Sequence, residues 1–103
     1  MASSIRVRAI ASDGVTDFKS LIRHPMDSGF VKDSKGKLIP PHYIKVVTVK
    51  WKDKTVFVAD WGPAVSKDPY LEFKFKGGAK GDPLTVSWVD NEGKSDSTTA
   101  KIM

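Results

Sequence analysis

The chain is a short cationic polypeptide of 103 residues, with 17 Lys and Arg against 12 Asp and Glu and a formal net charge of +5 at pH 7. Its 40% hydrophobic and 28% charged residues are the balance of a folded globular domain and exclude a mostly disordered chain. The length fits one domain over residues 1–103. The absence of cysteine excludes disulfides, thiolate nucleophiles and thiolate metal ligands, and it is compatible with either redox compartment.

Lysine supplies most of the positive charge, and the three arginines are Arg6, Arg8 and Arg23. Proteins that read nucleic-acid sequence rely on the planar arginine fork, whereas scattered lysines give a diffuse field suited to anionic ligands or acidic partners. We interpret the lysines as solvated strand faces and expect no nucleic-acid partner. The N-terminal stretch MASSIRVRAIASDG lacks the apolar segment of a secretory signal, and no later stretch approaches the length of a membrane span. We therefore expect no signal peptide on this chain and no membrane contact.

Alternation of apolar and polar residues with a period of two recurs along the chain, and no window holds helical spacing for long. The first expected strand begins at Ile5 and places Arg6 and Arg8 on one face. The second, Asp17–His24, ends where Pro25 interrupts the backbone hydrogen bonding. A polar loop follows, with a turn over 33–37 and a stiff return at Pro40-Pro41. The remaining expected strands are Tyr43–Trp51, Thr55–Trp61, Tyr70–Lys76, Leu84–Asp90 and Ser95–Ile102.

Seven short strands in about 100 residues are the number expected of an all-β, immunoglobulin-like β-sandwich of antiparallel strands. The second strand presents Phe18, Ser20 and Ile22 on one face. Four further aromatic residues fall at inward positions of their strands, so we assign them to the core: Trp51, Phe73, Phe75 and Trp88.

The sequence offers little that could catalyse a reaction. Its histidines, His24 and His42, fall in loops or at strand ends, and no Gly-flanked serine accompanies them, so we expect no enzyme. His24, Met26 and His42 lie on two loops that a sandwich could bring together. A blue-copper site would need the missing cysteine, and a zinc site would need carboxylates that spacing alone does not identify. We prefer solvent-facing histidines and expect no metal and no other cofactor, with a small metalloprotein kept as an alternative.

Two further patterns could suggest a binding site, but each is better explained as part of the β-sheet framework. The glycine-rich stretch 77–81 leads into Asp82-Pro83 and a strand, whereas a phosphate-binding loop would open a helix. In Tyr70–Lys76 the aromatic residues and the lysines occupy opposite faces, as burial predicts and as a single-strand nucleic-acid platform would not.

The corner between the fourth and fifth expected strands, Trp61-Gly62-Pro63-Ala64-Val65, is apolar and breaks the alternation. One interpretation is a partner contact, because aromatic anchors are enriched at interface cores. The other is a strand-crossing corner that packs on its own sandwich. Both interpretations remain open from the sequence.

Three stretches resemble the SoxZ family, the Z subunits of the bacterial Sox sulfur-oxidation system: SLIRHPMDSGFVKDSKGKLIPPHYI, TVFVADWGPAVSKDPYLEFKF and VSWVDNEGKS. The resemblance spans nearly the whole chain. The motifs that carry it are His24-Pro25-Met26, Lys32-Asp33 with Gly36, Ala59 to Ala64, Asp68 to Leu71 and Trp88-Val89-Asp90.

The resemblance implies a non-catalytic subunit of the SoxYZ sulfur carrier in thiosulfate oxidation. Its partner, the Y subunit, would carry the sulfur adduct on a cysteine of a mobile glycine-rich arm, and other Sox enzymes would dock transiently. It also implies a periplasmic location reached by export with the Y subunit. We place the face that binds the Y subunit or a processing enzyme at Trp61, Pro63, Val65 and Tyr70.

The isolated chain is also expected to be capable of self-association through the same face or an exposed strand edge. A stand-alone β-sandwich module that binds a ligand or carbohydrate is the main alternative function. It predicts a stable monomer with a ligand groove and no obligate partner.

Overall fold

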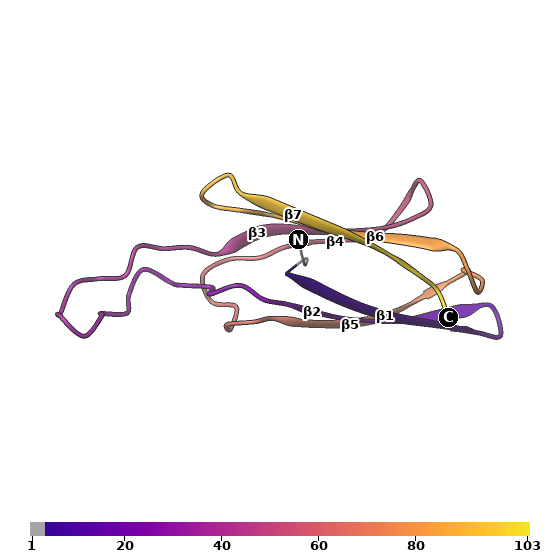
Figure 1. The fold of residues 1–103 in the computed structure, drawn as a ribbon, viewed down its shortest axis with the longest axis horizontal. Coiled ribbons are helices and arrows are strands. Elements are labelled where there is room, and N and C mark those ends of the chain that lie inside the picture. Colours follow the sequence, from indigo (N-terminus) through magenta and orange to yellow (C-terminus); the bar gives the residue numbers. More distant parts are fainter. Residues whose placement is uncertain (1–3) are drawn as a thin grey trace.

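The structure is a computed structural model that describes residues 4–103. Its described part is built from antiparallel strands that form two layers (Figure 1). The strands are β1 (Ile5–Ser12), β2 (Val15–Ile22), β3 (Ile44–Trp51), β4 (Lys54–Asp60), β5 (Tyr70–Lys76), β6 (Pro83–Asp90) and β7 (Ser95–Lys101). The all-β sandwich of seven antiparallel strands predicted from the sequence is therefore confirmed.

One sheet has the strand order β1-β2-β5, and the other has the order β4-β3-β6-β7. All neighbouring strands in both sheets pair antiparallel. The chain crosses between the sheets after β2, after β4 and after β5, so the loops at the two ends of the sandwich hold the layers together.

The core lies between the layers and follows the alternation of the strands. In β2 the buried residues include Phe18, Ser20 and Ile22, as predicted. Trp88 is buried, and three predicted core aromatics are half-buried and pack against the core: Trp51, Phe73 and Phe75. The rings of Phe57 and Phe73 stack with their centroids 4.5 Å apart, which links β4 of one sheet to β5 of the other.

Most strand boundaries differ from the sequence prediction by one or two residues, and the ends of the first two strands matter for the site. The first strand continues to Ser12, because Asp13 and Gly14 both adopt positive φ (53° and 78°) and close a two-residue hairpin into β2. Such turns match the twist of the paired strands. The second strand ends at Ile22, so His24 lies beyond it.

The connection from β2 to β3 forms a long projection, which we call the arm (residues 25–42). Figure 1 shows it extending from one end of the sandwich, and the molecule measures 53 × 25 × 19 Å along its principal axes. Asp27 pairs with His42 at the base, and Lys32 pairs with Leu38 near the tip. The predicted turn over 33–37 is present, with the Asp33 amide donating to the Lys37 carbonyl. No helix in residues 4–103 is long and apolar enough to cross a membrane.

Candidate functional site

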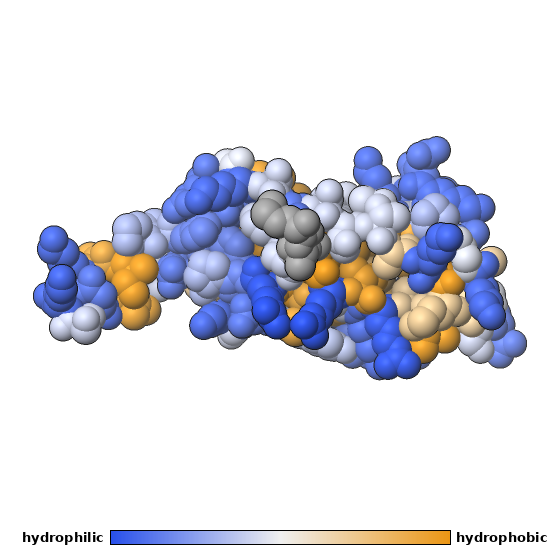
Figure 2. All heavy atoms as spheres, in the orientation of Figure 1, coloured by the Kyte–Doolittle hydropathy of each residue, from blue (hydrophilic) through white to orange (hydrophobic). Residues whose placement is uncertain are grey.

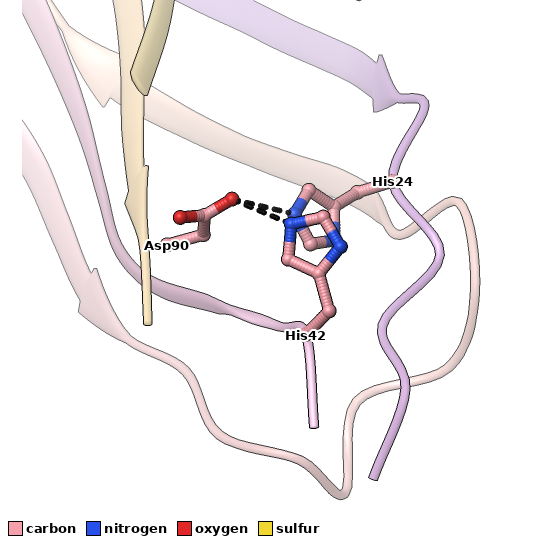
Figure 3. A group of neighbouring side chains, drawn as sticks. All are labelled: His24, His42 and Asp90. Atoms are coloured by element: carbon pink, nitrogen blue, oxygen red, sulfur yellow. Dashed lines mark hydrogen bonds and ion pairs between the residues drawn. The ribbon is translucent and has the colours of Figure 1, made fainter. Parts of the chain in front are cut away.

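Three polar side chains from separate segments meet at the end of the sandwich from which the arm projects. His24 follows β2, His42 precedes β3, and Asp90 is the last residue of β6 (Figure 3). The Nε2 atoms of His24 and His42 lie 3.3 Å and 2.8 Å from Oδ2 of Asp90. The side chains of His24 and Asp90 are 3% and 0% exposed, while that of His42 is 25% exposed. We call these three residues the histidine–aspartate cluster.

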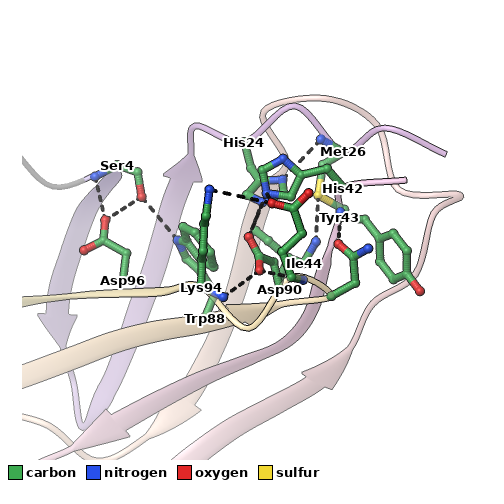
Figure 4. Close-up of polar contacts among 12 residues, drawn as sticks. Ser4, His24, Met26, His42, Tyr43, Ile44, Trp88, Asp90, Lys94 and Asp96 are labelled. Carbon is green, nitrogen blue, oxygen red and sulfur yellow. Dashed lines mark hydrogen bonds and ion pairs between the residues drawn. The ribbon is translucent and has the colours of Figure 1, made fainter. Parts of the chain in front are cut away.

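The carboxylate of Asp90 accepts hydrogen bonds on both of its oxygens (Figure 4). Oδ2 accepts from the two imidazoles, and Oδ1 accepts from the backbone amides of Glu92 and Lys94 at 3.0 Å and 2.9 Å. Burial acts to raise the pKa of Asp90, but the hydrogen bonds from His42, His24 and the two amides outweigh it, so the pKa lies below its ordinary value. The cluster therefore holds a buried carboxylate in its ionised form.

The second nitrogen of His24 is also occupied. The amide of Met26, a residue with a positive φ of 49°, donates to Nδ1 of His24 at 3.2 Å. Since Nδ1 accepts this hydrogen bond, Nε2 must carry the proton that His24 donates to Asp90. The ring of His24 also packs edge-on against Trp88, with the centroids 5.0 Å apart. Both position and tautomer of His24 are thus set by its surroundings.

Metal binding is the first chemistry to test, because one ligand atom from each of the three residues lies within 4.8 Å of the others. Glu92 offers a fourth possible ligand atom, Oε1, which lies 3.6 Å from Nε2 of His42. A histidine that binds a metal through one nitrogen ordinarily donates a hydrogen bond from the other. In His24 the other nitrogen faces a backbone amide donor, so the arrangement favours a hydrogen-bonded cluster over a metal centre.

Nucleophilic catalysis finds no support in this geometry. In the described part of the chain, no serine or threonine hydroxyl is hydrogen-bonded to His24 or His42. What the cluster does is tie three segments together: the start of the arm, the end of the arm and the turn between β6 and β7.

The prediction of solvent-facing histidines is wrong for His24, which is only 5% exposed. The physical reason is that the returning limb of the arm brings His42 beside His24, next to Asp90 at the end of β6. One signal in the sequence pointed this way. The alternation of β6 places Leu84, Val86, Trp88 and Asp90 on its inner face, and an inward carboxylate requires donors.

The four residues predicted to bind a partner differ in burial. Trp61 and Val65 are half-buried and pack against the core, whereas Pro63 is exposed. Tyr70 is exposed at the start of β5, on the outer face of the three-stranded sheet, where it lies opposite Leu21. There it helps line a shallow hollow of about 230 Å³ together with Arg6 and Leu21. Trp61 and Val65 thus contribute to packing, and partner binding by the four residues stays a prediction.

The segment between the corner and β5 is hydrogen-bonded to the histidine–aspartate cluster through Asp68. The amide of Asp68 donates to the carbonyl of His24 at 3.0 Å, and the amide of His24 donates to Oδ1 of Asp68 at 3.0 Å. Corner, arm and cluster therefore occupy the same end of the molecule.

Solved structures with the same arrangement of strands include two superoxide reductases. One, in the oxidised state, aligns with a TM-score of 0.61 and 11% identity over 98% of this chain and 88% of that chain. The other, a mutant superoxide reductase (neelaredoxin) from Archaeoglobus fulgidus in the reduced form, aligns with a TM-score of 0.59 and 18% identity over 97% of this chain and 89% of that chain. At these identities the likeness defines the class of fold and nothing more. No curated protein sequence matches the chain.

The family is established by the sequence itself. The model of the family described as "Sulphur oxidation protein SoxZ" matches residues 5–101, which is nearly the whole chain. The chain belongs to the SoxZ family, and its role lies in the Sox system of sulfur oxidation.

Proposed function

We propose that this chain is the non-catalytic subunit of the SoxYZ sulfur carrier. It pairs with a cysteine-bearing Y subunit and presents that subunit to the enzymes that oxidise thiosulfate-derived sulfur. The observation that carries the proposal is the combination of SoxZ family membership with a sequence that contains no cysteine. A family member without a thiol has no side chain suited to hold a sulfur adduct, so the adduct resides on another chain.

The structure supports a scaffold role. The histidine–aspartate cluster lacks a nucleophile, and its carboxylate is fully hydrogen-bonded. The rest of the described chain is a closely packed sandwich with loops concentrated at its ends. Such a body can be recognised by several enzymes while a tethered thiol on the partner moves between them.

The test is reconstitution with a purified Y subunit. Mixing the two chains is expected to give a stable heterodimer by size-exclusion chromatography with light scattering. After incubation with thiosulfate and the loading enzyme, mass spectrometry is expected to find the added sulfur on the Y subunit and an unchanged mass for this chain. A covalent adduct on this chain, or turnover by this chain alone, would overturn the proposal.

The periplasmic location is part of the same proposal, with export depending on the signal of the Y subunit. Cell fractionation is expected to find this chain in the periplasm when the Y subunit carries its signal and in the cytoplasm when that signal is deleted. Periplasmic recovery without any Y subunit would contradict it.

The partner face at the corner can be tested more cleanly than by changing Trp61 or Val65, because charges at those half-buried positions would disturb the core. Pro63→Asp and Tyr70→Asp change exposed residues instead. Weaker pairing in the Pro63 variant would support the corner as the contact, and weaker pairing in the Tyr70 variant alone would place it on the three-stranded sheet.

A further inference from the structure

The tip of the arm exposes large apolar side chains. Phe30 is 85% exposed, Val31 is 54% exposed and Leu38 is 59% exposed. In Figure 2 the arm carries a hydrophobic patch just behind its hydrophilic end. A phenylalanine exposed to this degree is unusual in a soluble protein unless a partner covers it.

The tip has a defined conformation. The carboxylate of Asp33 accepts hydrogen bonds from the amides of Lys35 and Lys37 at 2.8 Å and 3.0 Å, and the amide of Ile39 donates to the carbonyl of Val31 at 2.8 Å. These bonds fix the two limbs of the arm against each other, so the apolar side chains are presented from an ordered backbone.

The base of the arm is fixed as well. Asp27 and His42 exchange two backbone hydrogen bonds of 2.7 Å and 2.9 Å, and the side chain of Asn91 donates to the carbonyl of Pro41 at 2.8 Å. The histidine–aspartate cluster lies directly beneath and joins both limbs to β6 (Figure 3). An element ordered before binding loses little conformational entropy on binding, which raises the affinity that a small apolar patch can provide.

The charges on the tip identify the kind of surface that fits it. Lys32, Lys35 and Lys37 flank the apolar residues, and no carboxylate among residues 4–103 lies within 4.0 Å of their ammonium groups. The nearby acid, Asp33, uses its carboxylate on the backbone. With three lysines and one aspartate in residues 32–37, the tip is an apolar centre with a rim of net positive charge, and its complement is an apolar groove rimmed by carboxylates.

We propose that the tip of the arm inserts into such a groove on the Y subunit, and this rests on the proposed function above. The Y subunit is favoured over transiently docking enzymes because permanent interfaces are the more apolar class, and only a permanent partner keeps Phe30 and Leu38 covered between encounters. In this arrangement the histidine–aspartate cluster acts as a positioning device that sets the direction of the arm.

The first test removes the apolar contacts without changing charge. The double variant F30S/L38S is compared with V58S/V89S, which removes two exposed valines from the outer face of the four-stranded sheet. Isothermal titration calorimetry with purified Y subunit is expected to show about 100-fold weaker binding for F30S/L38S and unchanged binding for the control. Circular dichroism and thermal unfolding of each variant alone check that both remain folded.

The second test reverses the charge of the three lysines at the tip. The triple variant K32E/K35E/K37E is compared with K50E/K54E/K101E, which makes the same change of net charge on exposed strand residues elsewhere. Affinity for the Y subunit is expected to fall in the arm variant at 50 mM NaCl, and the difference from the control is expected to shrink at 500 mM NaCl.

The outcomes separate the two proposals. If the wild-type chain does not bind the Y subunit, both fail. Wild-type binding that F30S/L38S leaves intact overturns the arm interface alone. If that variant pairs normally but its heterodimer turns over poorly with Sox enzymes, the arm is an enzyme contact and the inference is wrong. Loss of self-association in F30S/L38S with unchanged Y binding would assign the patch to a second copy of this chain and also overturn it.

Discussion

The two ends of β6 are each closed by an aspartate, but in different ways. At the start of the strand, Oδ2 of Asp82 accepts hydrogen bonds from the indole of Trp51 at 2.9 Å and the amide of Ala79 at 3.0 Å. At the other end, Asp90 accepts from two imidazoles and two amides. The Asp82 side chain is 19% exposed, whereas that of Asp90 is fully buried.

The end closed by Asp82 is built for packing. Its turn brings Gly77, with a φ of 107°, so close to Trp51 that a Cβ on the glycine would lie 2.9 Å from the indole ring. The end closed by Asp90 carries the arm and the corner, and its donors come from loops. An aspartate that accepts several hydrogen bonds therefore stabilises a compact turn at one end of β6 and anchors a projecting arm at the other.

The largest effect is expected from Asp90→Ala. The change leaves the buried imidazole of His24, the half-buried imidazole of His42 and two amides without their acceptor, and we expect it to lower the free energy of unfolding by about 3–5 kcal/mol. Urea denaturation monitored by tryptophan fluorescence measures it. Amide hydrogen exchange should increase first in the arm and in the turn from β6 to β7, because the cluster holds both.

Asp82→Ala is the matched control at the opposite end. Water can reach the donors that Asp82 leaves behind, so its effect on stability should be smaller and should not extend to the arm. A larger loss of stability in Asp82→Ala than in Asp90→Ala would contradict the comparison.

An intermediate effect is expected from Trp51→Phe. The smaller ring keeps part of the contact with Phe75, whose centroid lies 5.8 Å away, but loses the indole hydrogen bond to Asp82. We expect a loss of about 1–2 kcal/mol from the thinned packing, measured by the same denaturation. Gly77→Ala in the Trp51→Phe background should be better tolerated than in the wild type; equal cost in both would refute the predicted clash.

The sequence predicted the sandwich because alternation is a local property. Phe18 and Ile22 are buried for the same reason that their neighbours Lys19 and Leu21 are not, and five residues of pattern suffice to show it. The hairpin from β1 to β2 was missed, although Asp13-Gly14 is a strong turn signal. The apolar–polar alternation on either side drew attention away from it.

The approach of His24 and His42 was considered from the sequence, and their rings do lie 4.5 Å apart, but the part of Asp90 was missed because it depends on long-range geometry. His24 and His42 are separated from Asp90 by 66 and 48 residues. The three side chains meet only because the two limbs of the arm pair at its base. The partner face was placed at Trp61, Pro63, Val65 and Tyr70, and it stays a prediction. Burial could not be read from the sequence there, since Trp61 packs against the core while Tyr70 begins a strand with its side chain exposed.

A smaller effect is expected in the dependence of stability on pH below neutrality. The folded-state pKa of Asp90 is lowered, and the indole hydrogen bond from Trp51 together with the Ala79 amide lowers that of Asp82. A lowered pKa means that the unfolded chain binds more protons, so each group contributes stability that is complete above its unfolded pKa and is lost as pH falls through the folded one. Urea midpoints between pH 6 and 3 should therefore fall less steeply in Asp90→Asn and in Asp82→Asn than in the wild type. A slope steeper than that of the wild type in either variant would contradict the assigned directions.

The smallest change is spectroscopic and distinguishes the two ends by the chemistry of their donors. An indole has one donor nitrogen, whereas His24 can place its proton on either nitrogen, and the Met26 amide at Nδ1 forces it onto Nε2. Long-range ¹H–¹⁵N correlation spectra of the native chain should therefore show His24 with a bare Nδ1 and a protonated Nε2. One equivalent of Zn²⁺ should leave these signals in place, and the signals of His42, the more exposed histidine of the cluster, are followed in the same spectra. Zinc binding that moves the proton of His24 to Nδ1 would show that the cluster can exchange its hydrogen bonds for a metal. The cluster that anchors the arm would then be a metal site, and Asp90 would differ from Asp82 in being a metal ligand as well as a hydrogen-bond acceptor.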